Sequence, residues 1–411
     1  MYREAEKIIL DCLKDKAFLP VKPPQDKLKY YFVEPGIAYS KTLWDWDSYW
    51  YVFSLLDICE LFKEDPAFDY SKKKKLLCMA SKGDVLNFLD FQEEDGFVPI
   101  MLRADYENDT YAIRPNVMNT HKPFLCQAAL LACRCNGDYH WLPVQKLIKY
   151  IEYYRKNQYD AQSGFFFWRD DVMIGGDNNP TVFGRPRNSS ADVFLNCFMV
   201  SEYRALVKIM ENLGLDPSRY RQEGEELASM IRSEMWDEFT GYFYTQDIQV
   251  KTYKTECFQH GLPAFWKTMP LKIKFWGCYL PLLCGIASSE QAERMARDFA
   301  GSPMNAAYGV RTLAEDEKMY NLAPSGNPSN WLGACWTIAN YALFQGFLNY
   351  GFWEQAREIF AKTIRCLSED IKSQGSMSES YHPDTGKPIL HNMFFSWNCL
   401  AASMIRKMRD L

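Results

Sequence analysis

Long apolar runs and a secretory leader are both missing from this sequence. Hydrophobic residues make up 47% of its 411 residues, yet no stretch reaches the roughly 18 consecutive apolar positions that a membrane-spanning helix needs. The first seven residues are rich in charge and no apolar segment follows them, so they do not have the form of a signal peptide. We therefore expect a soluble, cytoplasmic protein that does not associate with membranes.

The sequence also lacks a concentrated basic field. Its formal net charge is -5 at pH 7, whereas nucleic-acid-binding domains carry a strong local excess of Lys and Arg. The one basic run, at 72–75, is typical of the solvated start of a helix. We expect no nucleic-acid partner, and the sequence does not indicate an oligomeric state.

Metal-ligand spacings and phosphate-binding loops are absent as well. Cys133 and Cys135 have no partners at zinc-site spacing and no Gly-rich phosphate loop appears, so we expect no metal and no cofactor. The histidines, which form no ligand pattern either, are at 121, 140, 260, 382 and 391. Thirteen irregularly spaced cysteines, several within apolar helical segments, indicate reduced core thiols; examples are Cys126, Cys284 and Cys335.

Aromatic residues, in contrast, are plentiful. They make up 16% of the chain, including 12 Trp and 25 Tyr, and many lie among Gly and Asp instead of in apolar runs. Part of this content fills the core of a large domain. Aromatics beside carboxylates are also what a sugar site needs, because a sugar ring stacks its C–H face on an indole while its hydroxyls need acceptors.

Helical periodicity recurs along the whole chain. Within 354–369, for example, Ala356, Ile359, Phe360 and Thr363 share one helix face. Strand alternation is limited to short pieces at 164–168 and 242–244. The pattern predicts helices at 2–15, 47–63, 73–91, 117–135, 142–157, 190–213, 218–235, 271–287, 290–299, 330–350, 353–372 and 392–408.

Long connections alternate with short ones between these predicted helices. The long connections hold most of the Gly, Pro, Asp and Trp, and long loops on a compact scaffold are usually functional. No repeat of solenoid length and no Pro/Ser-rich linker is present. We predict one all-α domain over residues 1–411, a toroid of six helix pairs with the long loops at one face. These loops are at 92–116, 158–189, 236–270, 300–329 and 373–391.

The segment 43–50, Leu-Trp-Asp-Trp-Asp-Ser-Tyr-Trp, precedes an apolar helix. Asp47 or Ser48 could simply cap that helix, with the tryptophans in the core. Unpaired carboxylates are costly to bury, however. The two Asp residues interleaved with Trp therefore indicate a sugar-binding cluster of Trp44, Asp45, Trp46 and Asp47.

Three further segments carry residues suited to chemistry. Asp177 lies in Ile-Gly-Gly-Asp-Asn-Asn-Pro at 174–180, which taken alone is a turn. Glu379 lies in Ser-Glu-Ser-Tyr-His-Pro-Asp-Thr-Gly at 378–386, between the last two predicted helices. Trp331 and Trp336 lie in Asn-Trp-Leu-Gly-Ala-Cys-Trp at 330–336. Core packing is an equal alternative for this pair, because only a loop before the helix would let both face a pocket.

In this order, these segments resemble glycoside hydrolase family 63, in particular its short members that hydrolyse mannosylglycerate and glucosylglycerate. The similarity spans roughly residues 35 to 405 and includes Tyr-Gly-Val-Arg-Thr-Leu at 308–313. The resemblance implies an (α/α)6 barrel with Asp177 as general acid and Glu379 as general base. It also implies a sugar subsite lined by Trp44, Trp46, Asp47, Trp331 and Trp336.

The sequence departs from the family pattern beside the sugar. Trp-Leu-Gly-Ala-Cys-Trp replaces a frequent Trp-Arg-Gly-Pro-x-Trp, and His121-Lys122-Pro123 replaces a commoner Gln-Pro-Pro. The reaction class survives these changes, but the sugar and its aglycone do not follow from them. The remaining substrate-binding candidates are Tyr39, Asp45, His121, Lys122, Arg185, Arg311 and Gly333, with Asp192 and Asn196 as candidates for sugar hydroxyls.

A carboxylate aglycone such as glycerate would pair with arginine, because the guanidinium matches a carboxylate with two hydrogen bonds. Arg185, Arg187 and Arg311 are the candidates for this pairing. Surface ion pairing explains the same residues equally well.

The sequence therefore predicts an inverting α-glycosidase that acts on a small α-glucoside or α-mannoside. Protonated Asp177 would protonate the leaving oxygen while ionised Glu379 activates water. A trehalase-like or other α-glucosidase on the same fold is the alternative, and a phosphorylase would need a phosphate site that is not visible. A non-catalytic sugar-binding helical protein is the alternative from another class, although a binder has no reason to keep both carboxyl groups beside a water-sized gap.

Overall fold

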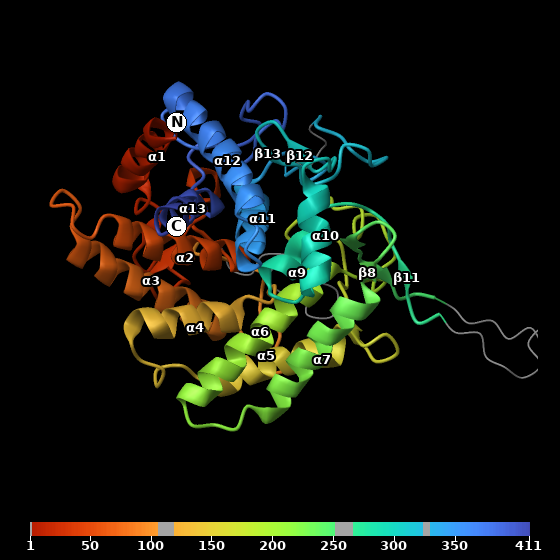
Figure 1. Ribbon diagram of the computed structural model, residues 1–411. Helices are drawn as coiled ribbons and strands as arrows, with labels where there is room; N and C mark the ends of the chain where they lie inside the picture. The colour runs from red at the N-terminus through yellow and green to blue at the C-terminus, as the bar shows by residue number, and fades with distance from the viewer. Residues whose placement is uncertain (1, 106–118, 251–265, 324–328) are drawn as a thin grey trace, which may run out of the picture.

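The computed structural model describes residues 2–105, 119–250, 266–323 and 329–411. His260 and parts of the predicted loops 92–116, 236–270 and 300–329 lie outside the described residues. Over the described part the chain is predominantly helical (Figure 1), which confirms the predicted class. Its α-helices are α1 (Arg3–Lys16), α2 (Asp45–Leu61), α3 (Tyr70–Asp90), α4 (Leu125–Asn136), α5 (Val144–Asn157), α6 (Val193–Asn212), α7 (Ser218–Glu234), α9 (Leu280–Leu283), α10 (Ser289–Phe299), α11 (Thr337–Asn349), α12 (Trp353–Gln374) and α13 (Leu400–Arg409).

Alternate helices contact one another in succession. In the part of the chain described, α2 contacts α4, α4 contacts α6, α6 contacts α9, α9 contacts α11, α11 contacts α13, and α13 contacts α2. Most of the other helices pack against members of this series: α3 against α2 and α4, α5 and α7 against α6, α12 against α11 and α13, and α1 against α13. Helices adjacent in sequence, such as α6 and α7, therefore lie side by side (Figure 1).

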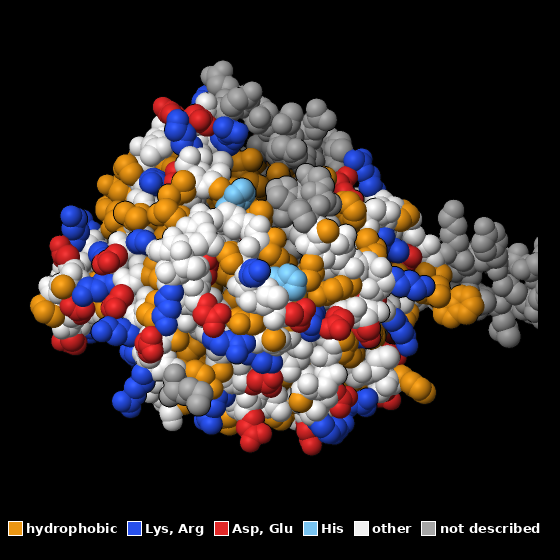
Figure 2. All heavy atoms as spheres, turned by 90° about the horizontal axis from the view of Figure 1, so that it is seen from above, with side chains coloured by type: hydrophobic (Ala, Val, Ile, Leu, Met, Phe, Trp, Pro, Cys, Tyr) orange, Lys and Arg blue, Asp and Glu red, His pale blue; other side chains and the backbone are white. Residues whose placement is uncertain are grey.

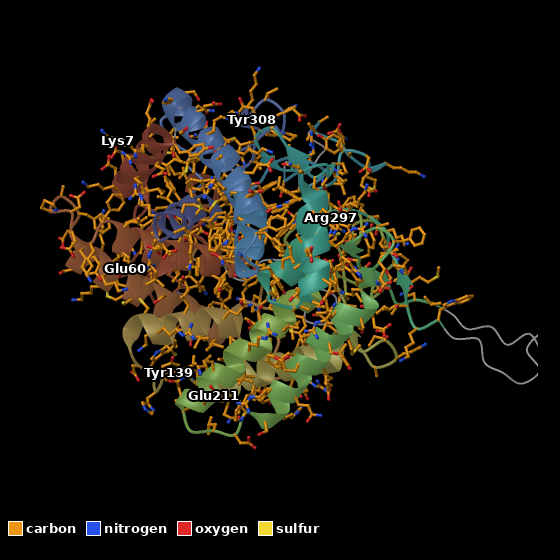
Figure 3. All side chains as sticks on the ribbon, in the orientation of Figure 1. Lys7, Glu60, Tyr139, Glu211, Arg297 and Tyr308 are labelled. Carbon is orange, nitrogen blue, oxygen red and sulfur yellow. The ribbon has the colours of Figure 1, made fainter. Side chains whose placement is uncertain are left out.

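The two sets of helices differ in how much surface they bury. All residues of α11 from 337 to 344 are buried, so protein covers this helix on every side. α10 instead begins with a capping box, in which Ser288 and Gln291 bond each other's backbone. Its buried residues share one face and are Ala292, Met295, Ala296 and Phe299. Many charged residues on the helices are exposed at the surface, among them Lys7, Glu60, Glu211 and Arg297, which are labelled in Figure 3.

One connected cluster of buried apolar side chains extends from Ile9 near the start of the chain to Ile405 near its end. On the outside, Lys and Arg side chains are interspersed with Asp and Glu over the face shown in Figure 2. None of the described helices is long and apolar enough to cross a membrane. The described cysteines are free thiols, as the sequence predicts; Cys126 and Cys335 are buried and Cys284 is partly buried.

The strands are short and pair mostly within loops. The predicted pieces at 164–168 and 242–244 are confirmed: β6 (Phe165–Phe166) pairs with β5 (Tyr159–Asp160), and β9 (Tyr242–Phe243) pairs with β8 (Trp236–Asp237), both antiparallel. The other strands are β1 (Val21–Lys22), β2 (Phe32–Val33), β3 (Thr42–Trp44), β4 (Met101–Arg103), β7 (Ser190–Ala191), β10 (Gln246–Asp247), β11 (Met269–Pro270), β12 (Asn305–Ala306) and β13 (Gly309–Val310).

Several helices start later than the periodicity predicts. The helices predicted at 117–135, 190–213 and 330–350 begin at Leu125, Val193 and Thr337. The one predicted at 271–287 is reduced to the 3₁₀ turn η2 (Trp276–Tyr279) followed by α9, and the one at 392–408 begins with the 3₁₀ turn η3 (Trp397–Cys399).

Backbone conformation explains two of these late starts. Gly333 has φ +134° and Met393 has φ +59°, and a right-handed helix excludes both values. The segments ahead of α11 and α13 are therefore extended or irregular, and they lead into the cavity described next.

Candidate active site

A cavity of about 470 Å³ opens where several of the helices begin. α2 contributes Trp46 and Asp47 from its first turn, and the segments ahead of α4 and α11 contribute Lys122 and Trp331. Its walls are formed by Pro35, Tyr39, Trp44, Trp46, Asp47, Lys122, Asp171, Val172, Met173, Gly175, Asp177, Phe183, Ser329, Trp331, Glu379, His391, Phe394 and Trp397. The cavity therefore gathers residues that lie more than 300 positions apart in the sequence, such as Tyr39 and Glu379.

Trp46 is the meeting point of the aromatic residues around this cavity. Its ring lies 5.2 Å from the ring of Trp397, which begins η3, and 5.9 Å from the ring of Trp331, ahead of α11. It also meets rings from the starts of α4, α6 and η2, which belong to Phe124, Phe194 and Trp276. One indole thus packs against the beginnings of the neighbouring helices, and aromatic pairs of this kind add to the free energy of apolar burial.

The segment ahead of α11 holds Trp331 against the loop of Asp177. Asn178 accepts a hydrogen bond from the Trp331 backbone N–H at 2.7 Å, and its amide donates to Asn330 at 3.1 Å. Trp336 does not line the cavity, but its ring stacks on Trp331 with centroids 4.2 Å apart. The sequence allowed both tryptophans to line a pocket or to pack in the core. In the structure Trp331 lines the cavity and Trp336 packs behind it.

Asp177 lies on a loop whose shape depends on Gly175. This glycine has φ +99°, and a Cβ there would lie 3.5 Å from the ring of Trp46 and 3.5 Å from the stem of Lys122. Burial raises the pKa of Asp177 above its usual value, although a hydrogen bond from Ser329 and the charge of Lys122 oppose that effect. Burial thus favours the protonated form of this carboxyl group.

Glu379 is held from two sides. Its backbone N–H donates to the carbonyl of His391 at 3.0 Å, and the Tyr39 hydroxyl lies 3.0 and 3.1 Å from its two carboxylate oxygens. The pKa of Glu379 is raised to about 8. Burial is the main cause, the charges of Asp47 and Asp177 add to the rise, and the Tyr39 hydrogen bond opposes it.

Asp47 is the third carboxyl group of the cavity, and like Glu379 it is buried. Its Oδ1 accepts a hydrogen bond from Ser396 at 2.9 Å. Burial raises the pKa of Asp47 to about 7, with Ser396 and Lys122 acting in the opposite direction. Three carboxyl groups with raised pKa values thus share one aromatic-lined cavity, and perturbed pKa values of this kind cluster at functional sites.

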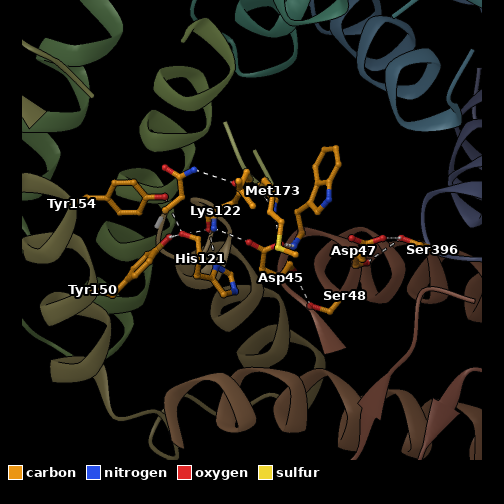
Figure 4. Close-up of polar contacts among 12 residues, drawn as sticks. Asp45, Asp47, Ser48, His121, Lys122, Tyr150, Tyr154, Met173 and Ser396 are labelled. Carbon is orange, nitrogen blue, oxygen red and sulfur yellow. Dashed lines mark hydrogen bonds and ion pairs between the residues drawn. The ribbon is translucent and has the colours of Figure 1, made fainter. Parts of the chain in front are cut away.

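Asp45 and His121 lie behind the wall and do not line it. Asp45 is buried and pairs with Lys122 at 2.9 Å (Figure 4). The carbonyl of His121 accepts hydrogen bonds from Tyr150 and Tyr154, both at 2.9 Å. Burial lowers the pKa of His121 to about 4, so its imidazole is neutral at pH 7.

The arginines proposed for a carboxylate aglycone are not among the residues that line the cavity. Arg185 pairs with Asp247 at 2.6 Å, and the exposed Arg187 pairs with Asp170 at 2.8 Å. Arg311 is buried and contacts Asp384 and Glu315.

Three other predicted residues have structural partners instead. Gly333 lies against the ring of Tyr320. Asp192 accepts hydrogen bonds from Thr245 and Trp168 and caps α6. Asn196 bonds the backbone of Phe166 on both sides of its amide.

Several wall residues were not predicted as site residues. Ser329, His391, Phe394 and Trp397 come from segments predicted as loop end or helix, where nothing in the periodicity separates a wall residue from a core residue. The remaining ones are Pro35, Asp171, Val172, Met173, Gly175 and Phe183. Asp171 and Gly175 could have been inferred from their proximity to Asp177 in the same Gly-rich loop. Among the described residues no group of His, Cys, Asp and Glu side chains could hold a metal ion.

Comparison with known proteins gives a family. The family model for the mannosylglycerate hydrolase MGH1-like glycoside hydrolase domain matches residues 86–398. Curated relatives include the mannosylglycerate hydrolases MGH1 and MGH2 of Selaginella moellendorffii, each 29% identical over 126 residues. Each match covers 30% of this chain and 24% of the relative, so the chain spans about a quarter of the length of the curated relatives it matches.

Solved structures share the fold. The GH63 mannosylglycerate hydrolase from Thermus thermophilus, in complex with glucose, has a TM-score of 0.68 and 17% identity, covering 95% of this chain and 99% of that one. The same hydrolase in complex with Tris and D-glycerate has a TM-score of 0.67 and 15% identity, covering 97% and 99%. Neutral trehalase Nth1 from Saccharomyces cerevisiae has a TM-score of 0.63 and 14% identity, covering 92% and 73%.

The family model covers most of the sequence, including the segments that carry Asp177 and Glu379. The resemblance to glycoside hydrolase family 63 seen in the sequence is thereby confirmed. The chain belongs to the family of glycoside hydrolases with a mannosylglycerate hydrolase MGH1-like domain.

Proposed function

We propose that the protein hydrolyses a small α-glucoside or α-mannoside with inversion at the anomeric carbon, using Asp177 as general acid and Glu379 as general base. The observation that carries this proposal is that these two carboxyl groups, far apart in the sequence, line the same aromatic cavity. Glu379 is buried and Asp177 is partly buried, and desolvation raises the pKa of each.

Acetal hydrolysis needs a proton for the leaving oxygen and an activated water at the anomeric carbon. In the proposed mechanism, Asp177 donates its proton to the glycosidic oxygen as the C–O bond breaks. Glu379 accepts a proton from a water molecule that attacks the opposite face of the sugar. The water oxygen becomes the new anomeric hydroxyl. After product release, Glu379 gives up the proton that it took from water and Asp177 takes up a proton, which restores the starting state.

Hydrogen bonding supports this division of roles. Tyr39 donates to Glu379 and thereby favours its ionised form, which a base needs; because the pKa is still about 8, the fraction of Glu379 able to act as base grows as the pH approaches that value. Ser329 and Lys122 favour ionised Asp177, but burial outweighs them. The repulsion among Asp47, Asp177 and Glu379 favours a state in which the group retains at least one proton at neutral pH.

We further propose that the helices form one domain, an (α/α)6 toroid. The closed series of contacts from α2 through α4, α6, α9, α11 and α13 back to α2 supports six inner helices. Trp46, which meets the beginnings of the neighbouring helices, would lie close to the axis, at the floor of the cavity.

The sugar and aglycone are proposed from the relatives and the cavity. The curated relatives are mannosylglycerate hydrolases, and the Thermus enzyme was solved with glucose and with D-glycerate. Trp44, Trp46 and Trp331 offer stacking surfaces for a sugar ring, and Asp47 offers an acceptor for its hydroxyls. A trehalase-like α-glucosidase is the second candidate, because neutral trehalase shares the fold.

The test is incubation with α-mannosides, α-glucosides, trehalose and glycosylglycerates, with proton NMR to identify the anomer released first. An inverting enzyme releases the β-anomer, and first release of the α-anomer would contradict the mechanism.

Asp177→Asn and Glu379→Gln should each lower kcat by about 10²- to 10⁴-fold. Asp84→Asn is the matched control, because Asp84 is a buried carboxyl group with a raised pKa outside the cavity. Tight sugar binding without turnover by any substrate would favour the non-catalytic alternative.

A further inference from the structure

Lys122 is the buried cation of the cavity wall. Its side chain is 2% exposed, and that of its ion-pair partner Asp45 is 0% exposed. A lysine is almost never buried to this degree unless its charge is paired. The sequence offered Lys122 as a residue that binds the sugar, within a His-Lys-Pro segment where the family commonly has Gln-Pro-Pro, but its contacts give it another task.

The contacts of Lys122 join three segments (Figure 4). Its backbone N–H donates to Asp45 Oδ2 at 2.8 Å, and its Nζ lies 2.9 Å from Asp45 Oδ1. The same Nζ donates to the carbonyl of Met173 at 3.0 Å. Asp45 is the first residue of α2, and Met173 lies four residues ahead of Asp177. One ammonium group thus ties the start of α2 to the loop of the proposed acid.

The loop itself does not adopt a conformation that the chain prefers by default. Met173 has φ +56°, a left-handed value that a residue with a side chain rarely adopts. Gly175, two residues on, packs its open side against the Lys122 stem, where a Cβ would lie 3.5 Å from Lys122 Cδ. The surroundings must hold such a conformation, and Lys122 supplies a hydrogen bond on one side and a packing surface on the other.

We propose that Lys122 is a positioning residue, whose ammonium group holds the Met173 carbonyl against the Asp45 carboxylate and so fixes Asp177 in the cavity. This inference rests on the proposed role of Asp177 as general acid. In this proposal Lys122 keeps the acid in position, and Asp45 binds Lys122 and not the sugar.

The same pair sets part of the charge around Asp177. Lys122 lowers the pKa of Asp177 and Asp45 raises it. The other ionisable groups that face Asp177 are Asp47, Glu379 and Tyr39, whose pKa values Asp177 raises in turn. Asp171 and His391 also line the cavity. The alkaline limb of the pH–rate profile reports loss of the acid's proton, so changes at Lys122 and Asp45 should move that limb in opposite directions.

The experiment compares Lys122→Met, Asp45→Asn and the double variant with wild type. Lys122→Met should lower kcat by about 10- to 100-fold, because misplacement of a reacting group is costly, with a smaller change in KM. Its alkaline limb should move up by about one pH unit, whereas that of Asp45→Asn should move down. Limbs that move in the same direction, or that do not move, would overturn the proposal, since loosened packing alone gives no opposite signs.

Two further measurements keep the result interpretable. Lys122→Met leaves Asp45 buried without a counter-charge, so it can fail to fold. The double variant removes both charges and should fold. Its alkaline limb should lie between those of Lys122→Met and wild type. Its kcat should still be lower than that of wild type, because the Met173 carbonyl has lost its hydrogen bond. A double variant with wild-type kcat would overturn the proposal.

The titration of the Asp177 carboxyl carbon can also be followed by ¹³C NMR, with the signal assigned by its loss in Asp177→Asn. This readout shows the same opposite shifts even if no substrate is turned over, so a failure of the proposed function is distinguishable from a failure of this inference. Lys146→Met is the matched control, because Lys146 also donates to a backbone carbonyl, that of Leu89, away from the cavity.

Discussion

The hydroxyl of Tyr39 lies within hydrogen-bond distance of both carboxylate oxygens of Glu379, at 3.0 and 3.1 Å. Burial and, to a smaller extent, the charges of Asp47 and Asp177 raise the pKa of Glu379, and this hydrogen bond counteracts the rise, which leaves the value at about 8. The ring of Tyr39 is fixed by edge contacts with Trp44, His391 and Phe394. The structure therefore gives Tyr39 a defined influence on the carboxyl group that we propose as the base.

Tyr39→Phe should move the acidic limb of the kcat/KM profile to higher pH. The base must be ionised to act, and the variant removes a donor that favours the ionised form, so the pKa of Glu379 rises. A hydrogen bond to a charged group contributes roughly 1.5–3 kcal/mol, which corresponds to a shift of about one to two pH units. The measurement is the pH dependence of kcat/KM. Tyr70→Phe, which removes a Tyr–Glu60 hydrogen bond on the surface, should leave the profile unchanged.

Glu379→Gln should be more stable than the wild type at high pH, and the difference should grow as the pH rises. The pKa of Glu379 is about 8 in the folded protein, against an ordinary value of 4.5. Between these values the folded state holds a proton that the unfolded state has released. The wild type therefore loses stability as the pH rises through this window, by an amount on the order of a few kcal/mol.

Glutamine has no proton to lose, so the variant escapes this loss. Its melting temperature should match that of the wild type near pH 4 and exceed it by roughly a few degrees at pH 8. Thermal unfolding across this pH range is the measurement. The exposed residue Glu226 provides the control: Glu226→Gln should track the wild type at every pH. A difference for Glu379→Gln that shrinks as the pH rises would contradict the assignment of a raised pKa.

The helical class could be predicted from the sequence because the apolar pattern of most helices has a 3.6-residue period. α12 and α7 were predicted with nearly correct limits, since Gly375 and the break after Glu234 leave little choice. The starts of α11 and α13 were not, because their approaches are rich in apolar and aromatic residues like the helices themselves. Tertiary contacts decide there, as the hydrogen bond between Asn178 and Trp331 illustrates.

The candidate site was predictable where a charged residue stands among aromatics. Asp47 attracts notice because a carboxyl group among tryptophans needs an explanation, whereas Asp177 and Glu379 were identified through the resemblance to glycoside hydrolase family 63. All three line the cavity. Trp397 does not attract notice, because one Trp in an apolar segment reads as core. The sequence also cannot distinguish an arginine that faces a substrate from one that holds a loop.

Arg311 is an instance of an arginine that holds a loop. Its guanidinium contacts Asp384 at 2.6 Å and donates to the carbonyl of Asn305 at 3.1 Å. Asp384 belongs to the turn that follows Glu379. Arg311→Met should therefore destabilise the protein by about 1–3 kcal/mol, mainly through the buried carbonyls left without a donor.

The same variant should not discriminate between substrates. The ratio of kcat/KM for a glycosylglycerate to that for a neutral α-glycoside should stay within about threefold of wild type, because Arg311 does not line the cavity. Urea unfolding and kinetics with both substrates check the two statements. A selective loss of roughly tenfold or more on the glycerate substrate, about 1.4 kcal/mol, would instead make Arg311 a ligand of the carboxylate.

Gly175→Ala should cost more activity than stability. Its φ of +99° disfavours any residue with a Cβ, at roughly 1–2 kcal/mol, and the new methyl group would lie 3.4 Å from Phe194 and 3.5 Å from Trp46 and Lys122. The loop can relieve the strain only by withdrawing from these neighbours, which displaces Asp177.

Gly137→Ala is the matched control: Gly137 also has a positive φ, +66°, but a Cβ there meets nothing within 4 Å. Both variants should lose similar stability in urea unfolding, while only Gly175→Ala should lose kcat, by about 10- to 100-fold. Equal kcat values for the two variants would mean that the position of Asp177 does not depend on this glycine.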